Sequence, residues 1–182
     1  MTSTIAGYRA GVWRLDPAHS EIGFVARHMM VSKVRGRFTG YTATITTAEN
    51  LTDSHVEVQV DLSSITTGIE ARDNHLRSSD FFNVATSPTM TFRSTAIRPD
   101  GDDWAMDGEL SIRGVTRPVT LAVEIGGFTP DPAGGTRAGF SAAGQINRHD
   151  FGVNWNAALE GGGVVVGDKV AIAIEAEAIL DE

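Results

Sequence analysis

Apolar and polar residues alternate along most of the chain, and a period of two is typical of half-buried β-strands. The clearest case runs from His55 to Leu62, where an aliphatic residue occupies every second position. Similar alternation marks residues 21–28, 90–96, 104–112, 119–125, 140–146 and 170–178. The pattern predicts a sheet with one buried face, which fixes the register of each strand.

The number and spacing of these segments indicate one all-β domain. About eight strands are joined mainly by short turns without repeating βα units, which favours antiparallel pairing. A sandwich and a barrel share this pattern. Glycines inside the strand patterns favour an eight-stranded antiparallel barrel, because glycine commonly marks the bends and bulges at which a sheet curls. These glycines are Gly23, Gly36, Gly40, Gly108 and Gly144.

One segment breaks the alternation, between residues 68 and 83. Ile69, Arg72, Asp73 and Leu76 fall at helical spacing, so we expect a short helical insertion there. A charged helix among strands either closes one end of a barrel or carries the polar part of a site.

The inward face of such a barrel consists of the alternating apolar residues. Periodicity fits a filled core as well as a tunnel around a ligand. Small residues on the same faces are compatible with open space inside: Ala26, Ser94, Ala96, Gly108, Ala142 and Gly144. The positions that we expect to line a tunnel are Ile22, Phe24, Ala26, Val58, Val60, Phe92, Trp104, Met106, Leu110, Val123, Phe140 and Ile174.

Composition narrows the classes of partner. The chain has 182 residues, with 15 Lys and Arg against 23 Asp and Glu. The net charge of −8 argues against a nucleic-acid partner held by a broad basic surface. Cysteine is absent, which removes disulfides, thiolate metal sites and cysteine nucleophiles.

The chain is not expected to span a membrane. No run approaches the ~18 apolar residues of a transmembrane helix. The first nine residues have neither the basic start nor the apolar stretch of an export signal. We therefore expect a cytoplasmic protein, and a periplasmic or secreted one only if a leader has been removed.

The histidines do not have the spacing of a metal site. His19, His28, His55, His75 and His149 include no pair at i, i+2 or i, i+4. We predict no metal and no cofactor. Neither a Gly-x-Ser-x-Gly elbow nor a phosphate-binding loop is present.

Arg72, Asp73, His75 and Asp80 offer groups for acid–base chemistry, which leaves an enzyme as the alternative. Asp73 and His75 are spaced i, i+2 and would point apart on a helix. A packed barrel with an interaction role is a third reading.

Several motifs together resemble the YceI-like family of polyisoprenoid-binding proteins. They span residues 13–182, which we take as the domain, preceded by an N-terminal arm of residues 1–12. The motifs are Trp13-x-Leu15-Asp16-x-x-His19-Ser20, Arg72-Asp73-x-His75-Leu76, Asp80-Phe81-Phe82, Pro88-x-Met90-Thr91-Phe92, residues 108–116 (Gly-Glu-Leu-Ser-Ile-Arg-Gly-Val-Thr) and Asn147-Arg148-x-Asp150-Phe151-Gly152.

The resemblance implies a lipocalin-like barrel with a long hydrophobic tunnel, a long-chain isoprenoid or similar lipid as ligand, and a homodimer. It brings no settled reaction. We hypothesise that His28, Arg72, His75 and Arg148 form the polar end of the tunnel, because Arg suits a phosphate or quinone oxygen and His can donate a hydrogen bond. The expected function is non-catalytic binding, storage or transport of a polyisoprenoid, an isoprenoid quinone or a fatty amide.

Overall fold

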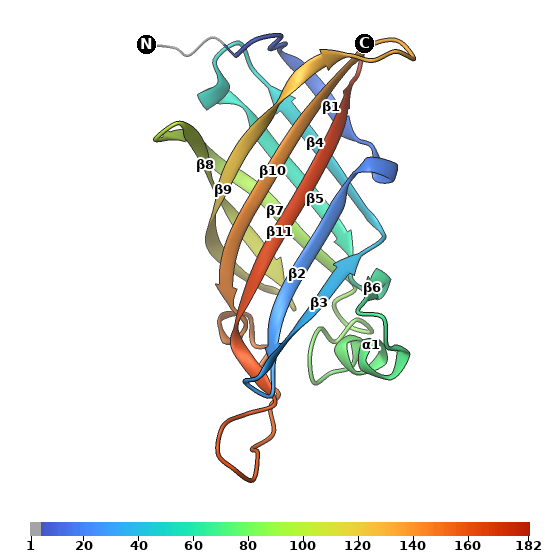
Figure 1. Ribbon diagram of the computed structural model, residues 1–182, viewed down its shortest axis with the longest axis vertical. Coiled ribbons are helices and arrows are strands. Elements are labelled where there is room, and N and C mark those ends of the chain that lie inside the picture. Colours follow the sequence, from blue (N-terminus) through green and yellow to red (C-terminus); the bar gives the residue numbers. More distant parts are fainter. Residues whose placement is uncertain (1–4) are drawn as a thin grey trace.

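The strands form a single antiparallel sheet that closes on itself into a barrel (Figure 1). The computed structural model describes residues 5–182. The closed ring has eight strands, so the all-β barrel prediction is confirmed. In order around the ring they are β1 (Gly11–Leu15), β4 (Tyr41–Thr47), β5 (His55–Asp61), β7 (Thr89–Asp100), β8 (Asp103–Ile112), β9 (Val115–Pro130), β10 (Thr136–Asn147) and β11 (Val166–Leu180).

The long strand β11 carries two strands on one edge. Its C-terminal part pairs with β1, where Trp13 lies opposite Leu180. Its N-terminal part pairs with β2 (Glu21–His28), where Phe24 lies opposite Ile172. β2 continues through β3 (Ser32–Phe38) to β6 (Ile65–Thr66). These three strands therefore extend the wall at the end of the barrel away from the termini (Figure 1).

A helix and four short 3₁₀ segments complete the described chain. The 3₁₀ segments are η1 (Pro17–His19), η2 (Leu51–Asp53), η3 (Leu62–Ser64) and η4 (Arg148–Phe151). The helix α1 (Glu70–Arg77) is shorter than the expected insertion near residues 68–83. It ends where Ser78 turns extended, and the Ser78 hydroxyl donates to the His75 carbonyl at 2.6 Å. Residues 79–82 and 84–86 form turns after it.

The first strand of the barrel includes the last two residues of the N-terminal segment 1–12. β1 begins at Gly11, so residues 11 and 12 belong to the sheet, because Gly11 and Val12 pair with Thr47 and Thr46 of β4. Residues 1–4 of the expected arm lie outside the described residues.

The inward row of β7 was predicted incorrectly at one residue, Ala96. β7 has a bulge between Ser94 and Ala96, and a bulge reverses the facing of every later residue in the strand. Ala96, expected inside, is exposed, and Ile97 lines the interior instead. Alternation in the sequence continues through this point without a signal.

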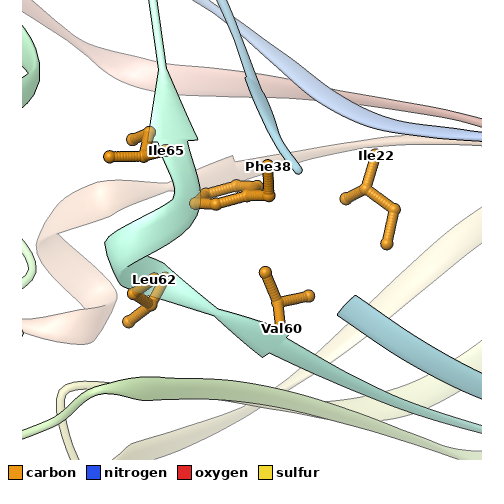
Figure 2. Close-up of a cluster of buried hydrophobic side chains, with 5 residues drawn as sticks. All are labelled: Ile22, Phe38, Val60, Leu62 and Ile65. Carbon is orange, nitrogen blue, oxygen red and sulfur yellow. The ribbon is translucent and has the colours of Figure 1, made fainter. Parts of the chain in front are cut away.

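Buried side chains gather in three clusters. One, drawn in Figure 2, consists of Ile22, Phe38, Val60, Leu62 and Ile65. Leu76 of α1 and Phe82 pack against it. They also pack against the second cluster, which consists of Phe81, Leu110, Ile112, Phe151 and Val153. These contacts seat α1 on one end of the barrel.

The third cluster fills the opposite end, near the termini. Trp13 is fully buried there among Ala138, Ala178 and Leu180. Its indole Nε1 donates to Thr47 Oγ1 at 2.8 Å, which satisfies the one polar group that the ring buries.

Candidate functional site

An apolar cavity of about 270 Å³ runs inside the barrel, measured as the space that the centres of water-sized molecules can occupy. A single water needs roughly 10–15 Å³ by this measure. The wall includes all the large apolar residues that the alternation placed inward: Ile22, Phe24, Val58, Val60, Phe92, Trp104, Met106, Leu110, Val123, Phe140 and Ile174, with Ala26 beside them. The cavity is therefore much larger than the site of a single bound water, and its lining surface is almost entirely apolar.

Glycines shape this wall by giving aromatic rings room. Gly36 is the cross-strand partner of Phe24, and a Cβ at residue 36 would overlap the Phe24 ring. Gly108 is the cross-strand partner of Ser94, and a Cβ at residue 108 would likewise overlap the Phe92 ring. Each ring lies over a glycine of the neighbouring strand, which an alanine there would prevent. Glycine in these strands is therefore a packing requirement as well as a place to bend.

Among residues 5–182, Arg148 is the one charged side chain on the cavity wall. It is the first residue of η4 and is buried, with only 4% of its surface exposed. Nε donates to the Gly167 carbonyl at 2.9 Å, and Nη1 donates to the Val153 and Trp155 carbonyls at 2.7 and 2.9 Å. Nη2 donates to the Val166 carbonyl at 3.2 Å. Burial lowers the pKa of Arg148, yet arginine stays charged.

These bonds give Arg148 a structural role that the sequence does not reveal. The guanidinium holds the segment after η4 against the start of β11 through main-chain carbonyls. The Val166 carbonyl also accepts from Asn156 Nδ2 at 2.8 Å. Its charge remains at the α1 end of an apolar cavity, without an ion-pair partner among residues 5–182.

Arg72 and Asp73 both bind Thr67, just before α1. Arg72 Nε donates to Thr67 Oγ1 at 2.7 Å, and Nη2 donates to the Thr67 carbonyl at 2.9 Å. The buried Asp73 carboxylate accepts from the Thr67 amide at 2.8 Å and from its hydroxyl. Neither residue lies on the cavity wall. The two charges fasten the loop that leads into the helix.

His75, also on α1, makes different contacts and lies next to the aromatic residues Phe81 and Trp155. Its Nε2 is 2.8 Å from Asp80 Oδ2. The imidazole meets the rings of Phe81 and Trp155 edge-on, at centroid distances of 5.0 and 4.6 Å. Phe81 lines the cavity, so His75 is one side chain removed from it.

The four residues hypothesised as a polar end do not form one cluster. Trp155 connects two of them, since its ring contacts His75 and its carbonyl accepts from Arg148. Arg72 is committed to Thr67. His28 ends β2, opposite Ser32 and Val166, and is not part of the wall, whereas Ala26 two residues earlier is. The possible acid–base group likewise separates into Arg72–Thr67–Asp73 and His75–Asp80.

The sequence does not place Phe151 and Val153 at the α1 end of the cavity. Phe81, Phe151 and Val153 line the cavity there, but they lie in a turn, in η4 and just after η4, where no period of two marks the inward side. Within the family motifs, Phe81 follows Asp80 and Phe151 follows Asp150. Among residues 5–182, no three His, Cys, Asp or Glu side chains are placed to hold a metal ion.

Comparisons with known proteins point to one family. A family model described as the YceI-like domain matches residues 13–178. The chain is 41% identical over 136 residues to Protein YceI of Escherichia coli O17:K52:H18, covering 74% of this chain and 71% of that protein.

Two solved structures are similar across most of the chain. The crystal structure of the Campylobacter jejuni YCEI protein has a TM-score of 0.72 at 32% identity, covering 86% of this chain and 90% of that one. A polyisoprenoid binding domain from Saccharophagus degradans, implicated in plant cell wall breakdown, has a TM-score of 0.67. At 18% identity, with 95% of this chain and 100% of that chain covered, the second likeness concerns the fold.

Proposed function

Because the chain belongs to the YceI-like family, we propose that it binds and carries a long-chain amphiphilic lipid inside the barrel. The ligand class is a polyisoprenoid, an isoprenoid quinone or a fatty amide. The observation that carries the proposal is the apolar cavity, whose wall has carbon from every strand of the ring. The similar polyisoprenoid binding domain supports the choice of lipid.

The physics of the wall favours chain binding over recognition of a polar molecule. Burial contributes roughly 0.8 kcal/mol per methylene, and the rings of Phe24, Phe92 and Phe140 present flat apolar surface along the cavity. A polar ligand would lose its hydrogen bonds to water with few replacements. Affinity should therefore grow with the length of the apolar chain.

The charge of Arg148 supports an orientation for the ligand. It lies at the α1 end, and the opposite end is filled by the Trp13 cluster. A polar or anionic head group would lie nearer to Arg148, with the chain extending toward Trp13. Because the guanidinium already serves four carbonyls, its effect on a head group would come from charge rather than from a free donor.

We further propose that the role is non-catalytic. None of Arg72, Asp73, His75 and Asp80 lies on the cavity wall, and two of them are occupied by Thr67. Among these four residues, the His75–Asp80 pair is the arrangement that favours the alternative, an enzyme acting on an isoprenoid-type lipid, because an imidazole beside a carboxylate is a common acid–base unit.

Organic extraction of the purified protein followed by mass spectrometry tests the carrier. We expect a long-chain lipid near one molecule per chain, or its uptake when delipidated protein is mixed with a polyprenol or an isoprenoid quinone. Protein that stays empty under both treatments would contradict the proposal. The substitution His75→Ala separates a carrier from an enzyme. A carrier is supported if the unmodified protein does not turn over the lipid and the variant takes up as much lipid as the unmodified protein. An enzyme is supported if the unmodified protein turns over the lipid and the variant does not.

We extend the proposal to a homodimer, which rests on the family resemblance. Sedimentation of the purified protein tests this, and a single species at the chain mass of 19.4 kDa would contradict it.

A further inference from the structure

The β2–β3 hairpin ends in three exposed apolar residues. Met29, Met30 and Val31 are 43%, 56% and 81% exposed. The hairpin end lies at the same end of the barrel as α1, beside the loop of residues 155–165 (Figure 1). The Met29 amide donates to the Val165 carbonyl of that loop at 2.8 Å. We call Met29, Met30 and Val31 the apolar tip.

The needs of the turn do not explain these residues. Met29 and Met30 have φ values of 52° and 63°, and the Val31 amide donates to the His28 carbonyl at 3.2 Å. A two-residue turn with both φ values positive favours Asn-Gly, since side chains other than Asn, Asp and Gly are disfavoured there. Folding alone would thus select polar or small residues at this place, whereas the chain carries two large apolar ones.

Four cations lie on the outer face of the same hairpin. Lys33, Arg35 and Arg37 occupy alternate positions of β3, all exposed, and the exposed Arg27 is the cross-strand partner of Lys33. We call these four residues the basic face. They are four of only 15 cationic residues in a chain with net charge −8.

The basic face is free of acidic partners in the described chain. The ion pairs of residues 5–182 include none of these four cations. The cross-strand partners of Arg35 and Arg37 are uncharged: Val25 and Gly23 of β2, and Thr66 of β6. By contrast, Arg14, Arg93, Arg98 and Arg137 elsewhere on the barrel all pair with carboxylates.

We propose that the β2–β3 hairpin docks on the surface of an anionic lipid bilayer. The apolar tip would enter the boundary between head groups and acyl chains, and the basic face would lie against lipid phosphates. The net negative charge of the chain does not prevent this, because carboxylates farther than about 8 Å from the bilayer are largely screened at physiological salt. Local charge complementarity therefore decides the contact.

A second copy of the chain is a poorer match to this surface. β3 pairs with β6 only at Arg37 and Phe38, so residues 32–36 have a free sheet edge that another β3 would in principle join. Such pairing would bring the Lys33 and Arg35 side chains of two copies together, and like charges opposite each other destabilise a sheet. Lysine and arginine on an edge strand oppose self-association and suit an anionic partner.

The docking surface adjoins one end of the cavity. Ala26 and Val166 line the cavity, and Ala26 lies two residues before His28, which pairs with Val166. A docked hairpin would hold this end of the barrel next to the bilayer. The inference does not depend on the proposed lipid function, because docking can be measured with delipidated protein.

Co-sedimentation with vesicles tests the proposal. Delipidated protein is mixed with phosphatidylcholine vesicles and with vesicles that also contain phosphatidylglycerol. We expect binding to the second kind only, weakened by added salt. The double substitution Lys33→Gln with Arg35→Gln should lower the partition constant roughly 30-fold, because each cation near an anionic bilayer contributes about 1 kcal/mol to binding. A control with Arg93→Gln and Arg117→Gln removes two exposed cations from β7 and β9 and should bind as the unmodified protein does.

Met29→Asn with Met30→Gly isolates the apolar tip. This pair suits the turn better than the natural residues, so the variant should fold at least as stably, which thermal unfolding verifies, while vesicle binding falls at least tenfold. Unchanged binding by this variant would overturn the role of the tip. Three results would each overturn the bilayer as partner. The Arg93 and Arg117 control could lose as much vesicle binding as the Lys33 and Arg35 variant, or the unmodified protein could fail to bind anionic vesicles. The third is an unmodified protein that is a dimer while the Lys33 and Arg35 variant is a monomer.

Discussion

The ring of Phe24 occupies the space that a Cβ at Gly36 would need, and the two residues face each other across β2 and β3. Gly36→Ala should therefore lower the free energy of unfolding by about 1–3 kcal/mol, the usual cost of overpacking. Denaturant unfolding measures this. Gly139→Ala is the matched control, since a Cβ there meets nothing closer than 4.0 Å. A cost at Gly36 that persists in a Phe24→Leu background would show that the ring is not its cause.

Arg148 should be more important for stability than an exposed arginine. Arg148→Lys keeps the charge but replaces a planar fork that serves four carbonyls with a point donor. We expect a loss of about 2–4 kcal/mol, because hydrogen bonds to charged groups contribute roughly 1.5–3 kcal/mol each and some carbonyls lose their partner. Hydrogen exchange should rise first in residues 152–157. Arg117→Lys, on the surface, should change stability little; equal losses would contradict the role of the carbonyl contacts.

The ion cluster around Arg137 predicts a dependence of stability on acid. Arg137 Nη1 lies 2.8 Å from Asp16 Oδ2, and mainly this bond, with a second from His19, lowers the Asp16 pKa from 3.8 to about 2. An unfolded carboxyl takes up its proton at the higher pH, so the contribution is present above about pH 4 and is lost as the pH falls toward 2.

Arg137→Gln should therefore flatten the pH dependence of unfolding in that window. The Asp16 carboxyl resonance should also titrate at a higher pH in the variant. Arg93→Gln makes the same change of charge at an exposed pair with Glu109, and its profile should follow that of the unmodified protein. An Arg137→Gln profile that keeps the original slope would rule out this ion cluster as the cause.

Filling the cavity should displace its ligand. Ala142 lines the cavity while its neighbour Ala143 is exposed, so Ala142→Phe and Ala143→Phe make the same change on opposite faces of β10. The inward ring takes the place of two or three methylenes, worth about 2 kcal/mol, so lipid affinity should fall roughly 30-fold. Binding of an isoprenoid quinone by fluorescence quenching measures this. Equal affinities in the two variants would place the ligand elsewhere.

The sequence indicates the rows of the sheet but not the partners of its polar side chains, for a physical reason. Val58 and Val60 show their facing through alternation, because pleating forces successive side chains to opposite faces. Ala96 does not, because a bulge leaves no mark in the hydrophobic pattern. Arg148 and Arg72 have partners that are main-chain carbonyls and a threonine brought together by folding, and residue types along the chain carry no record of such contacts.

The position of β11 has a consequence for the order in which the protein is made. Its residues Val166–Leu180 pair with β10 on one edge and with both β1 and β2 on the other, so the ring cannot close until Leu180 has left the ribosome. Trp13 must wait for a partner that is synthesised 167 residues later. Sheets with such distant pairings fold slowly and expose apolar surface meanwhile. Until β11 is synthesised, the unclosed sheet therefore exposes to solvent the apolar residues that later line the cavity. The pairing of β11 buries this surface, so the solubility of the newly made chain depends on that strand.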